Sequence, residues 1–137
     1  MKHSTSRRTG ALLLATLTLF ALTTAVRAGE FSVKEYNEFH ELLHPLQHEA
    51  LPAKDFQRVR TNADELVKRG NAIVHLNVPK GTAQNQVEEF RSELKKFENA
   101  LSKFSEDSHK GTDEQLEVSF SAVHDSFEML AGMLPRK

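Results

Sequence analysis

Residues 87–104 read VEEFRSELKKFENALSKF, and this stretch decides the fold class. Its apolar residues recur in alternating steps of three and four, which places them along one face of an α-helix. The repeat is the pattern of helices that pack at a shallow angle on their neighbours. The other positions are mostly Glu, Lys and Arg, which predicts a solvated outer face. The apolar positions are Val87, Phe90, Leu94, Phe97, Leu101 and Phe104.

A second row of apolar residues with the same spacing follows Gly111, and we call each such row a seam. Thr112 and Gln115 stand at the spacing of a capping box, in which each residue bonds the backbone of the other. We therefore expect a helix that begins at Thr112 and ends before Pro135. Its expected apolar positions are Leu116, Phe120, Val123, Phe127, Leu130 and Leu134.

Two further helices are expected before these. The second begins after Pro52, a residue tolerated in the first turn of a helix, and ends before a turn at residues 79–81. Gly70 lies inside it and weakens it by ~1 kcal/mol relative to alanine. The first, at about residues 32–51, contains Pro45, which removes one helix hydrogen bond. We expect this first helix to be kinked near Pro45, or to consist of two short helices that meet there.

Short links join the four helices, so neighbours in sequence are expected to be antiparallel neighbours in space. The sequence therefore predicts an all-α domain, an antiparallel up-down-up-down four-helix bundle, over residues 29–137. Eight phenylalanines of this stretch are expected to supply much of the core. The sequence contains no cysteine, which excludes disulfides, a thiol nucleophile, a zinc–thiolate site and thioether-linked haem.

Residues 1–28 have the pattern of a secretory signal peptide. Basic residues precede an apolar run at 11–25, and small residues lead to a cleavage site after Ala28. The run is short and rich in threonine for a span of ~20 apolar residues, so we expect no stable membrane insertion after cleavage. An uncleaved anchor is the alternative. The pair Arg7 and Arg8 leaves both the general and the twin-arginine export routes open. The predicted location is periplasmic or secreted.

The charge of the chain bears on its partners. The predicted signal peptide contains four of the 18 basic residues and none of the 19 acidic residues, so the mature chain would carry a net charge of −5. Nucleic-acid binding requires a basic face that neutralises phosphates. We therefore expect no nucleic-acid partner.

Six histidines remain in the mature chain, and His40, His44 and His48 recur every four residues of the first helix. This spacing places imidazoles on successive turns, where they can offer nitrogens to a transition-metal ion. On a straight helix His40 lies at the boundary of the core face, whereas His48 lies nearly opposite and should be exposed. The alternative is a set of polar surface residues with no ligand, which is our expectation for His75 and His109.

His124 is placed near this row by counting along the chain. In an antiparallel bundle the first and last helices are adjacent, and His124 and His40 lie eleven residues from the corresponding helix ends. We therefore expect His40 and His124 to face each other with His44 one turn above, and we predict His40, His44 and His124 as metal ligands. Asp125 is not expected to act with His124, because adjacent helical residues point about 100° apart.

Around His124 the last helix resembles that of a cytochrome c-prime. That family carries Cys-x-x-Cys-His, commonly followed by an acidic residue and by an aromatic residue three positions after the histidine. His124, Asp125 and Phe127 match this pattern. Phe120 and Val123 stand where the two cysteines would be. The helix order and the turn between the second and third helices also agree with the family.

The resemblance covers most of residues 30–134 and implies a four-helix bundle with His124 as the cofactor-binding residue. Without the cysteines, haem could not be attached covalently. The related soluble cytochrome b type binds haem through a methionine of the first helix and a histidine of the last. Only the histidine is present here, because the first helix has no methionine. The resemblance leaves open an apo relative, a metal binder and a non-covalent haem binder.

Catalysis is not expected. The sequence has no nucleophile elbow, no glycine-rich phosphate loop and no His-Glu-x-x-His motif. We predict a non-enzymatic, exported helical bundle that binds a transition-metal ion or non-covalent haem through histidines. The alternative is a ligand-free interaction or chaperone-like module of the periplasm, with another protein or a second copy of the chain as partner. The sequence does not identify the metal, the partner or the oligomeric state.

Overall fold

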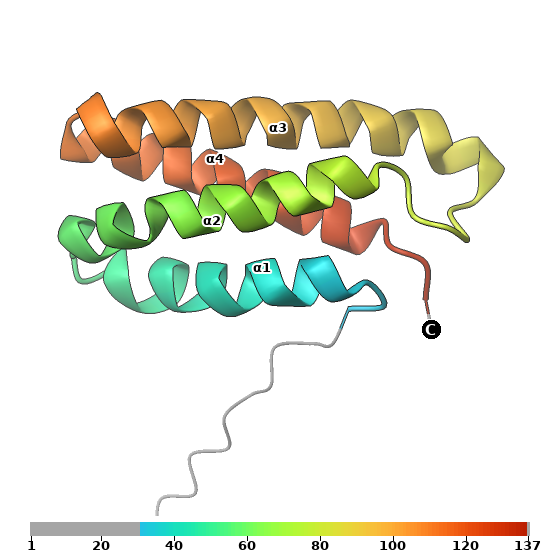
Figure 1. Cartoon of the computed structure of the whole chain (residues 1–137), viewed down its shortest axis with the longest axis horizontal. Helices are drawn as coiled ribbons and strands as arrows, with labels where there is room; N and C mark the ends of the chain where they lie inside the picture. The colour runs from blue at the N-terminus through green and yellow to red at the C-terminus, as the bar shows by residue number, and fades with distance from the viewer. Residues whose placement is uncertain (1–30, 137) are drawn as a thin grey trace, which may run out of the picture.

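Four α-helices that pack against one another make up the structure, a computed structural model that describes residues 31–136 (Figure 1). Residues 31–136 contain no strand, so the predicted all-α class is confirmed. The predicted signal peptide and its cleavage site lie outside the described residues. The elements are α1 (Lys34–Pro45), the π-helical turn η1 (Leu46–Ala50), α2 (Phe56–Leu76), the 3-10 turn η2 (Gln84–Gln86), α3 (Val87–Lys110) and α4 (Asp113–Gly132).

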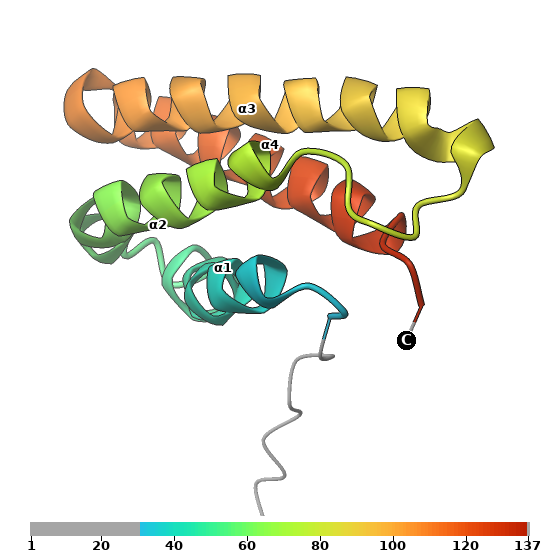
Figure 2. The ribbon, with the colours of Figure 1, turned by 45° about the vertical axis from the view of Figure 1, so that its right-hand side comes forward.

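The helices are not equally close to one another. The backbones of α3 and α4 approach most extensively, followed by α2 with α3 and α1 with α2, whereas α1 and α4 come close at no more than a few points. Figures 1 and 2 show α1 at one edge of the molecule, next to α2. The start of the described chain is tied to its end, since the Ser32 hydroxyl donates to the Pro135 carbonyl oxygen over 2.8 Å. Within the described range no helix combines the length and the apolar character needed to cross a membrane.

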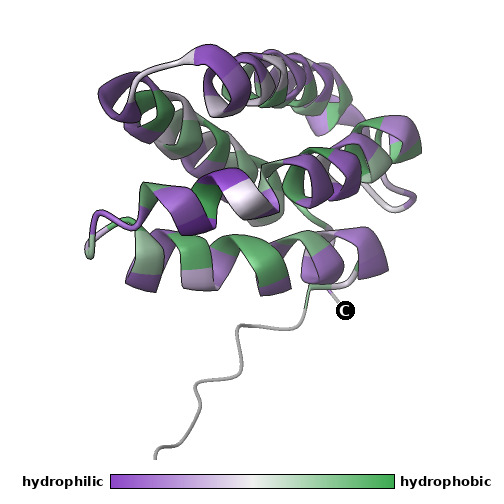
Figure 3. Cartoon of the chain, turned by 60° about the vertical axis from the view of Figure 1, so that its left-hand side comes forward, coloured by the Kyte–Doolittle hydropathy of each residue, from purple (hydrophilic) through white to green (hydrophobic). Residues whose placement is uncertain are grey.

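The predicted seams of α3 and α4 form the centre of the core. Phe97 and Phe127 have no exposed surface, and their ring centres lie 6.4 Å apart. Of the twelve predicted seam positions, ten are buried, and Val87 and Leu134 at the outer ends of the two seams are half-buried. Figure 3 shows the hydrophobic residues of the helices gathered on the sides that face the other helices. Burial of each such side chain contributes about 1.5–3 kcal/mol relative to exposure.

Gly70 lets α2 and α3 approach closely. It is buried, and a Cβ atom at this position would lie 2.6 Å from both terminal methyl carbons of Leu101. A glycine that the sequence marks only as a weak point of α2 therefore provides the space into which a core leucine of α3 fits.

The predicted helix starts are correct for α4 and wrong for α2. Thr112 Oγ1 accepts from the backbone N–H of Gln115, and the Gln115 side chain accepts from the N–H of Thr112, which completes the predicted capping box. In contrast, α2 begins at Phe56 and not next to Pro52. Its cap is Asp55, whose carboxylate accepts from a backbone N–H of the first turn. A short acidic side chain can satisfy a free N–H, which proline cannot do.

The hydrogen-bond pattern changes directly after Pro45, the residue at which the kink is predicted. The N–H of Leu51 donates to the carbonyl of Leu46 over 2.9 Å, and the N–H of Asp55 donates to that of Ala50 over 2.9 Å. Both bonds span five residues, the spacing of a π-helix. Because such a turn holds about one residue more than an α-turn, side chains after Pro45 are rotated by about 100° from their places on a straight α-helix.

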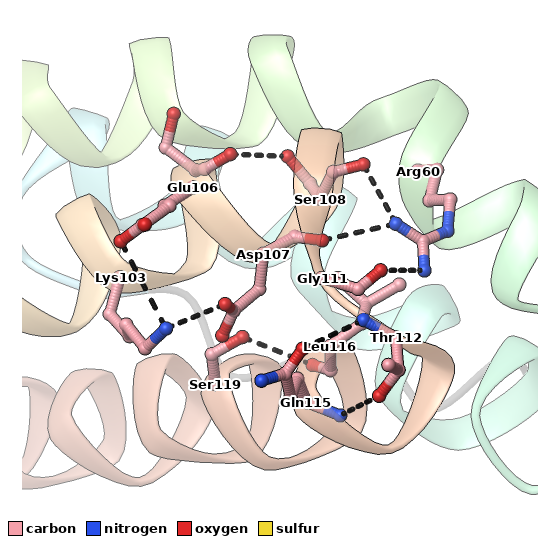
Figure 4. A network of polar contacts seen from close by, with 11 residues as sticks. Arg60, Lys103, Glu106, Asp107, Ser108, Gly111, Thr112, Gln115, Leu116 and Ser119 are labelled. Carbon is pink, nitrogen blue, oxygen red and sulfur yellow. Dashed lines mark hydrogen bonds and ion pairs between the residues drawn. The ribbon is translucent and has the colours of Figure 1, made fainter.

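Arg60 of α2 closes the connection between α3 and α4 (Figure 4). Its Nη1 atom donates to the carbonyl oxygens of Asp107 and Ser108 over 3.0 and 2.9 Å. Its Nη2 atom donates to the carbonyl oxygen of Gly111 over 3.0 Å and to the carboxylate of Asp113 over 2.9 Å. Carbonyl groups at the end of a helix lack a full set of intrahelical donors, and one guanidinium supplies them here.

The carboxylate of Asp107 belongs to the same network. Asp107 is buried and accepts a hydrogen bond from Lys103 Nζ over 2.6 Å. This bond holds the pKa of Asp107 below its ordinary value, and the nearby Ser119 hydroxyl acts in the same direction. The end of the molecule at which α3 passes into α4 is therefore fixed by charged hydrogen bonds.

Candidate functional site

Four histidine rings lie in a row that runs from α1 through η1 to α4. The ring centres of His40 and His44 are 5.4 Å apart, those of His44 and His48 are 4.4 Å apart, and those of His48 and His124 are 6.4 Å apart. We call these four residues the histidine row. His44 and His48 are exposed, while His40 and His124 are half-buried. The row therefore has a solvent-facing side that an ion can reach without a change in the fold.

The ring contacts of the predicted ligands differ in part from those that the sequence predicts. His40 and His44 are neighbours, as their spacing indicates. The ring beside His124 is that of His48, and His40 is stacked instead on Phe127, with ring centres 5.8 Å apart. His124 still acts on His40, whose pKa it lowers, but the ring contacts of these two residues are with His48 and Phe127 and not with each other. His48 was left out of the predicted ligand set, although its predicted exposure is confirmed.

The position of His48 follows from the π turn. His48 lies in η1, after Pro45, where the extra residue of the turn changes the direction of each side chain. The prediction assumed a straight α-helix and placed His48 nearly opposite the core face. Pro45 was the signal available in the sequence, because proline cannot donate the hydrogen bond that would continue an α-helix.

His124 has a carboxylate partner. Its Nδ1 atom lies 3.1 Å from Oδ1 of Asp125, and its side chain is 22% exposed. The side chains of these adjacent residues contact each other, although helical geometry alone predicts that they point about 100° apart. A proton on Nδ1 donates to this carboxylate and leaves the lone pair of Nε2 free. Carboxylates beside metal-binding histidines have this orienting role.

His40 is held toward its neutral form. Burial lowers its pKa, and the neighbouring His44 lowers it further, while Glu128 acts in the opposite direction. Smaller contributions from His124 and His48 also lower it. Only the neutral imidazole offers a lone pair to a metal ion, so this environment favours the binding form.

The remaining histidines and the carboxylate next to His48 in sequence have partners of their own. Glu49, a carboxylate next to His48 in sequence, pairs with Arg58 over 3.0 Å. His75 is exposed, with Nδ1 2.6 Å from the carbonyl oxygen of Asn71. His109 is also exposed and lies 3.1 Å from the Asp64 carboxylate. Within residues 31–136, no three His, Asp or Glu side chains are already arranged to hold one metal ion. Use of the row by a metal therefore requires its rings to turn.

A haem in the bundle interior does not fit the described residues. Phe120 and Val123, at the positions of the family's cysteines, have no exposed surface. Phe120 packs edge-on against Phe104, with ring centres 5.6 Å apart. The interior at this level is therefore filled by side chains of the protein itself.

The chain matches no family model, no curated protein and no solved structure. Function is therefore inferred from the geometry of the histidine row.

Proposed function

We propose that this protein is an exported, non-enzymatic four-helix bundle that binds a transition-metal ion through histidines. The observation that carries the proposal is the unbroken row of four imidazoles, His40, His44, His48 and His124, which joins two separate helical segments. Imidazole nitrogen is a preferred ligand of zinc, copper and nickel.

The spacing of the rings supports this proposal. An ion bound at ~2.0–2.1 Å from a ring nitrogen lies ~3.2 Å from the ring centre, so two rings that share an ion, in line on either side of it, have centres at most ~6.5 Å apart. The three neighbouring pairs of the row, at 4.4–6.4 Å, all fall within this limit. Exposed imidazoles can change rotamer at small cost, and rotation is what the row needs to become a site.

An ion is favoured over haem because it needs no large cavity in the core. Phe120 and Val123 can remain where they are when an ion binds to the row at the surface. The cytochrome c-prime resemblance is retained within this proposal as a relation of fold in which His124 keeps a ligand role without haem.

The proposal includes the arrangement of the chain. We infer an antiparallel up-down-up-down bundle that is kinked at Pro45 and is released from a signal peptide into the periplasm or the medium. Support for the antiparallel arrangement comes from two contacts between α1 or its following loop and α4 or its end. Ser32 bonds to Pro135, and Lys54 pairs with Glu117 over 2.7 Å. Ser32, which precedes Lys54, thus contacts Pro135, which follows Glu117, as expected for two antiparallel segments.

One observation favours a second candidate, an interaction module without a ligand. Val118 and Met129 of α4 are 71% and 55% exposed, which is unusual for large apolar side chains. Val118 and Ala122 also line a mainly apolar groove between α3 and α4. A protein partner or a second copy of the chain could cover this face.

Titration of the purified protein distinguishes the two candidates. Calorimetry with zinc(II) and copper(II) at neutral pH should show saturable binding of one ion. Copper(II) should give a new visible band on binding, whereas added haem should keep the spectrum that it has without the protein. Replacement of His75 or His109 by alanine should leave the affinity unchanged. Absence of zinc and copper binding would overturn the proposed metal-binding function. A mass twice that of the chain, abolished by Val118→Asp, would then favour the interaction module.

A further inference from the structure

The two helical segments that carry the histidine row pack closely against other helices but have few backbone contacts with each other. The first segment, α1 with η1, lies along α2, whereas the backbones of α1 and α4 have few close approaches. The gap between the first segment and α4 is bridged by side chains, among them the rings of His48 and His124. These two rings come from different segments, while the other neighbouring pairs of the row belong to the first segment alone.

We propose that a transition-metal ion is held between His48 and His124, with His44 as third ligand and Asp125 as the carboxylate that orients His124, and that this ion fastens η1 to α4. The inference rests on the proposed metal-binding function and makes it specific. It assigns the ion to a site that bridges η1 and α4, not to a pair of histidines on one helix.

The π turn supplies the first reason. It turns His48 toward α4, and it keeps His48 4.4 Å from His44, measured between ring centres. Two imidazoles of the first segment and one of α4 can therefore meet at one point once the rings have changed rotamer. His40 is a poorer candidate for this point, because Phe31 and Phe127 pack against its ring at 5.4 and 5.8 Å.

Asp125 supplies the second reason. Its carboxylate accepts from Nδ1 of His124 over 3.1 Å and so fixes which nitrogen of that ring remains available. A ring oriented in this way loses less rotational freedom when it binds an ion. Within the row, His124 is the histidine for which the structure gives such a carboxylate contact.

The distance between His48 and His124 supplies the third reason. Their centres are 6.4 Å apart, whereas two rings bound to one tetrahedral zinc ion have centres ~5 Å apart. Binding must therefore draw the rings together, and with them η1 and α4. A ligand that binds the folded state in this way raises the temperature of unfolding and protects the fastened segment from local opening.

Zinc(II) titration of the purified full chain tests this inference. Calorimetry and thermal unfolding should be measured for the wild type, His48→Ala, His124→Gln, Asp125→Asn and the control His109→Ala. We expect at least a tenfold loss of zinc affinity for the two histidine variants and a 10–100-fold loss for Asp125→Asn. The rise in unfolding temperature on zinc addition should disappear in His48→Ala and His124→Gln and persist in the control.

Hydrogen exchange gives a readout that a purely structural role would not produce. Zinc should slow amide exchange in residues 46–54 of the wild type and leave it unchanged in His124→Gln. The unfolding temperatures of the metal-free variants show whether they are folded, and His48→Ala removes only an exposed ring.

The outcomes separate the inference from the function on which it rests. If His124→Gln and His48→Ala bind zinc as the wild type does, while His40→Ala or His44→Ala does not, the protein binds metal on one helix and the cross-helix site is wrong. If the wild type binds no zinc and no copper, both the site and the proposed function fall.

Discussion

The two halves of α4 are attached to the rest of the molecule in different ways. At its start, Arg60 and Thr112 hold the connection from α3 with hydrogen bonds of 2.9–3.2 Å. In its second half, Phe127 meets rings of the first segment at centre distances of 4.9–5.8 Å, and His124 meets His48. One attachment consists of directional polar bonds, and the other consists of stacked and edge-on rings.

The difference indicates where the molecule can respond to a ligand. A hydrogen bond weakens steeply when its angle changes, so the Arg60 network fixes one geometry. Ring contacts are broader in orientation and tolerate small rotations. The histidine row lies on the second kind of attachment. Under the proposed metal-binding function, the rings in the second half of α4 are therefore the groups that would rotate around the ion.

The largest expected effect comes from the ring attachment. Phe127→Ala removes a fully buried ring that contacts Phe39 and Phe97, and it should lower the free energy of unfolding by ~3–5 kcal/mol. Urea denaturation measures the loss. Phe56→Ala removes the same atoms from a half-buried position and should cost less. A loss below ~1 kcal/mol for Phe127→Ala would show that the ring attachment contributes little to stability.

A smaller effect is expected at the polar attachment. Arg60→Ala removes hydrogen bonds from a charged donor to three carbonyls and one carboxylate, which should cost ~1.5–3 kcal/mol. The matched control is Arg58→Ala, whose exposed pair with Glu49 should be worth ~0–1 kcal/mol. Equal losses for the two variants in urea denaturation would contradict the distinction between the network and an ordinary surface pair.

The Asp107 carboxylate should make the polar attachment sensitive to acid. Its pKa is lowered in the folded protein, so it stabilises the fold above the ordinary value of 3.8, and this stabilisation is lost as the pH falls through the lowered pKa. Asp107→Asn should therefore be less stable than the wild type at pH 7, and the difference should shrink as the pH falls below about 4. Urea denaturation across this range measures it. A difference that is constant with pH would mean that packing, not charge, explains the loss.

The smallest effect is expected at His40, measured with a chelator present. Its pKa is lowered by burial and by His44, so below the ordinary value of 6.5 the unfolded chain takes up its proton more readily than the folded protein does. The lowered pKa therefore has no effect on the free energy of unfolding above pH 6.5, and it decreases that free energy as the pH falls below 6.5. His40→Gln should flatten that decrease in thermal unfolding between pH 7 and 5. An unchanged slope would assign the pH dependence to other groups.

The sequence predicts the attachments that depend on local pattern. The seam of Phe90, Leu94 and Phe97 is visible from a period of three and four, and the capping box of Thr112 is visible from a spacing of three. Each of these signals is contained within a few residues of the sequence. The pairing of Glu88 with Arg91 on the outer face of α3 is predictable for the same reason.

The attachments that depend on distant residues could not be predicted. Nothing in the sequence near Arg60 indicates carbonyl groups some fifty positions away. The ring contact between His48 and His124 is not predicted, because one additional residue in a turn after Pro45 changes the direction of His48. The bond between His124 and Asp125 depends on side-chain rotamers, which the helical period does not determine.

Tyr36 gives the ring attachment an optical reporter. It has no exposed surface and lies 5.8 Å from Phe127 and 6.4 Å from Phe31, measured between ring centres. Its hydroxyl has no hydrogen-bond partner among the described residues, and burial raises its pKa. The chain contains one tyrosine and no tryptophan, so its tyrosine fluorescence comes from this single position. Release of α1 from α4 would bring the hydroxyl into water and change the emission, and a bound copper ion nearby would quench it. The movement of one helix can thus be followed by light in the unlabelled protein.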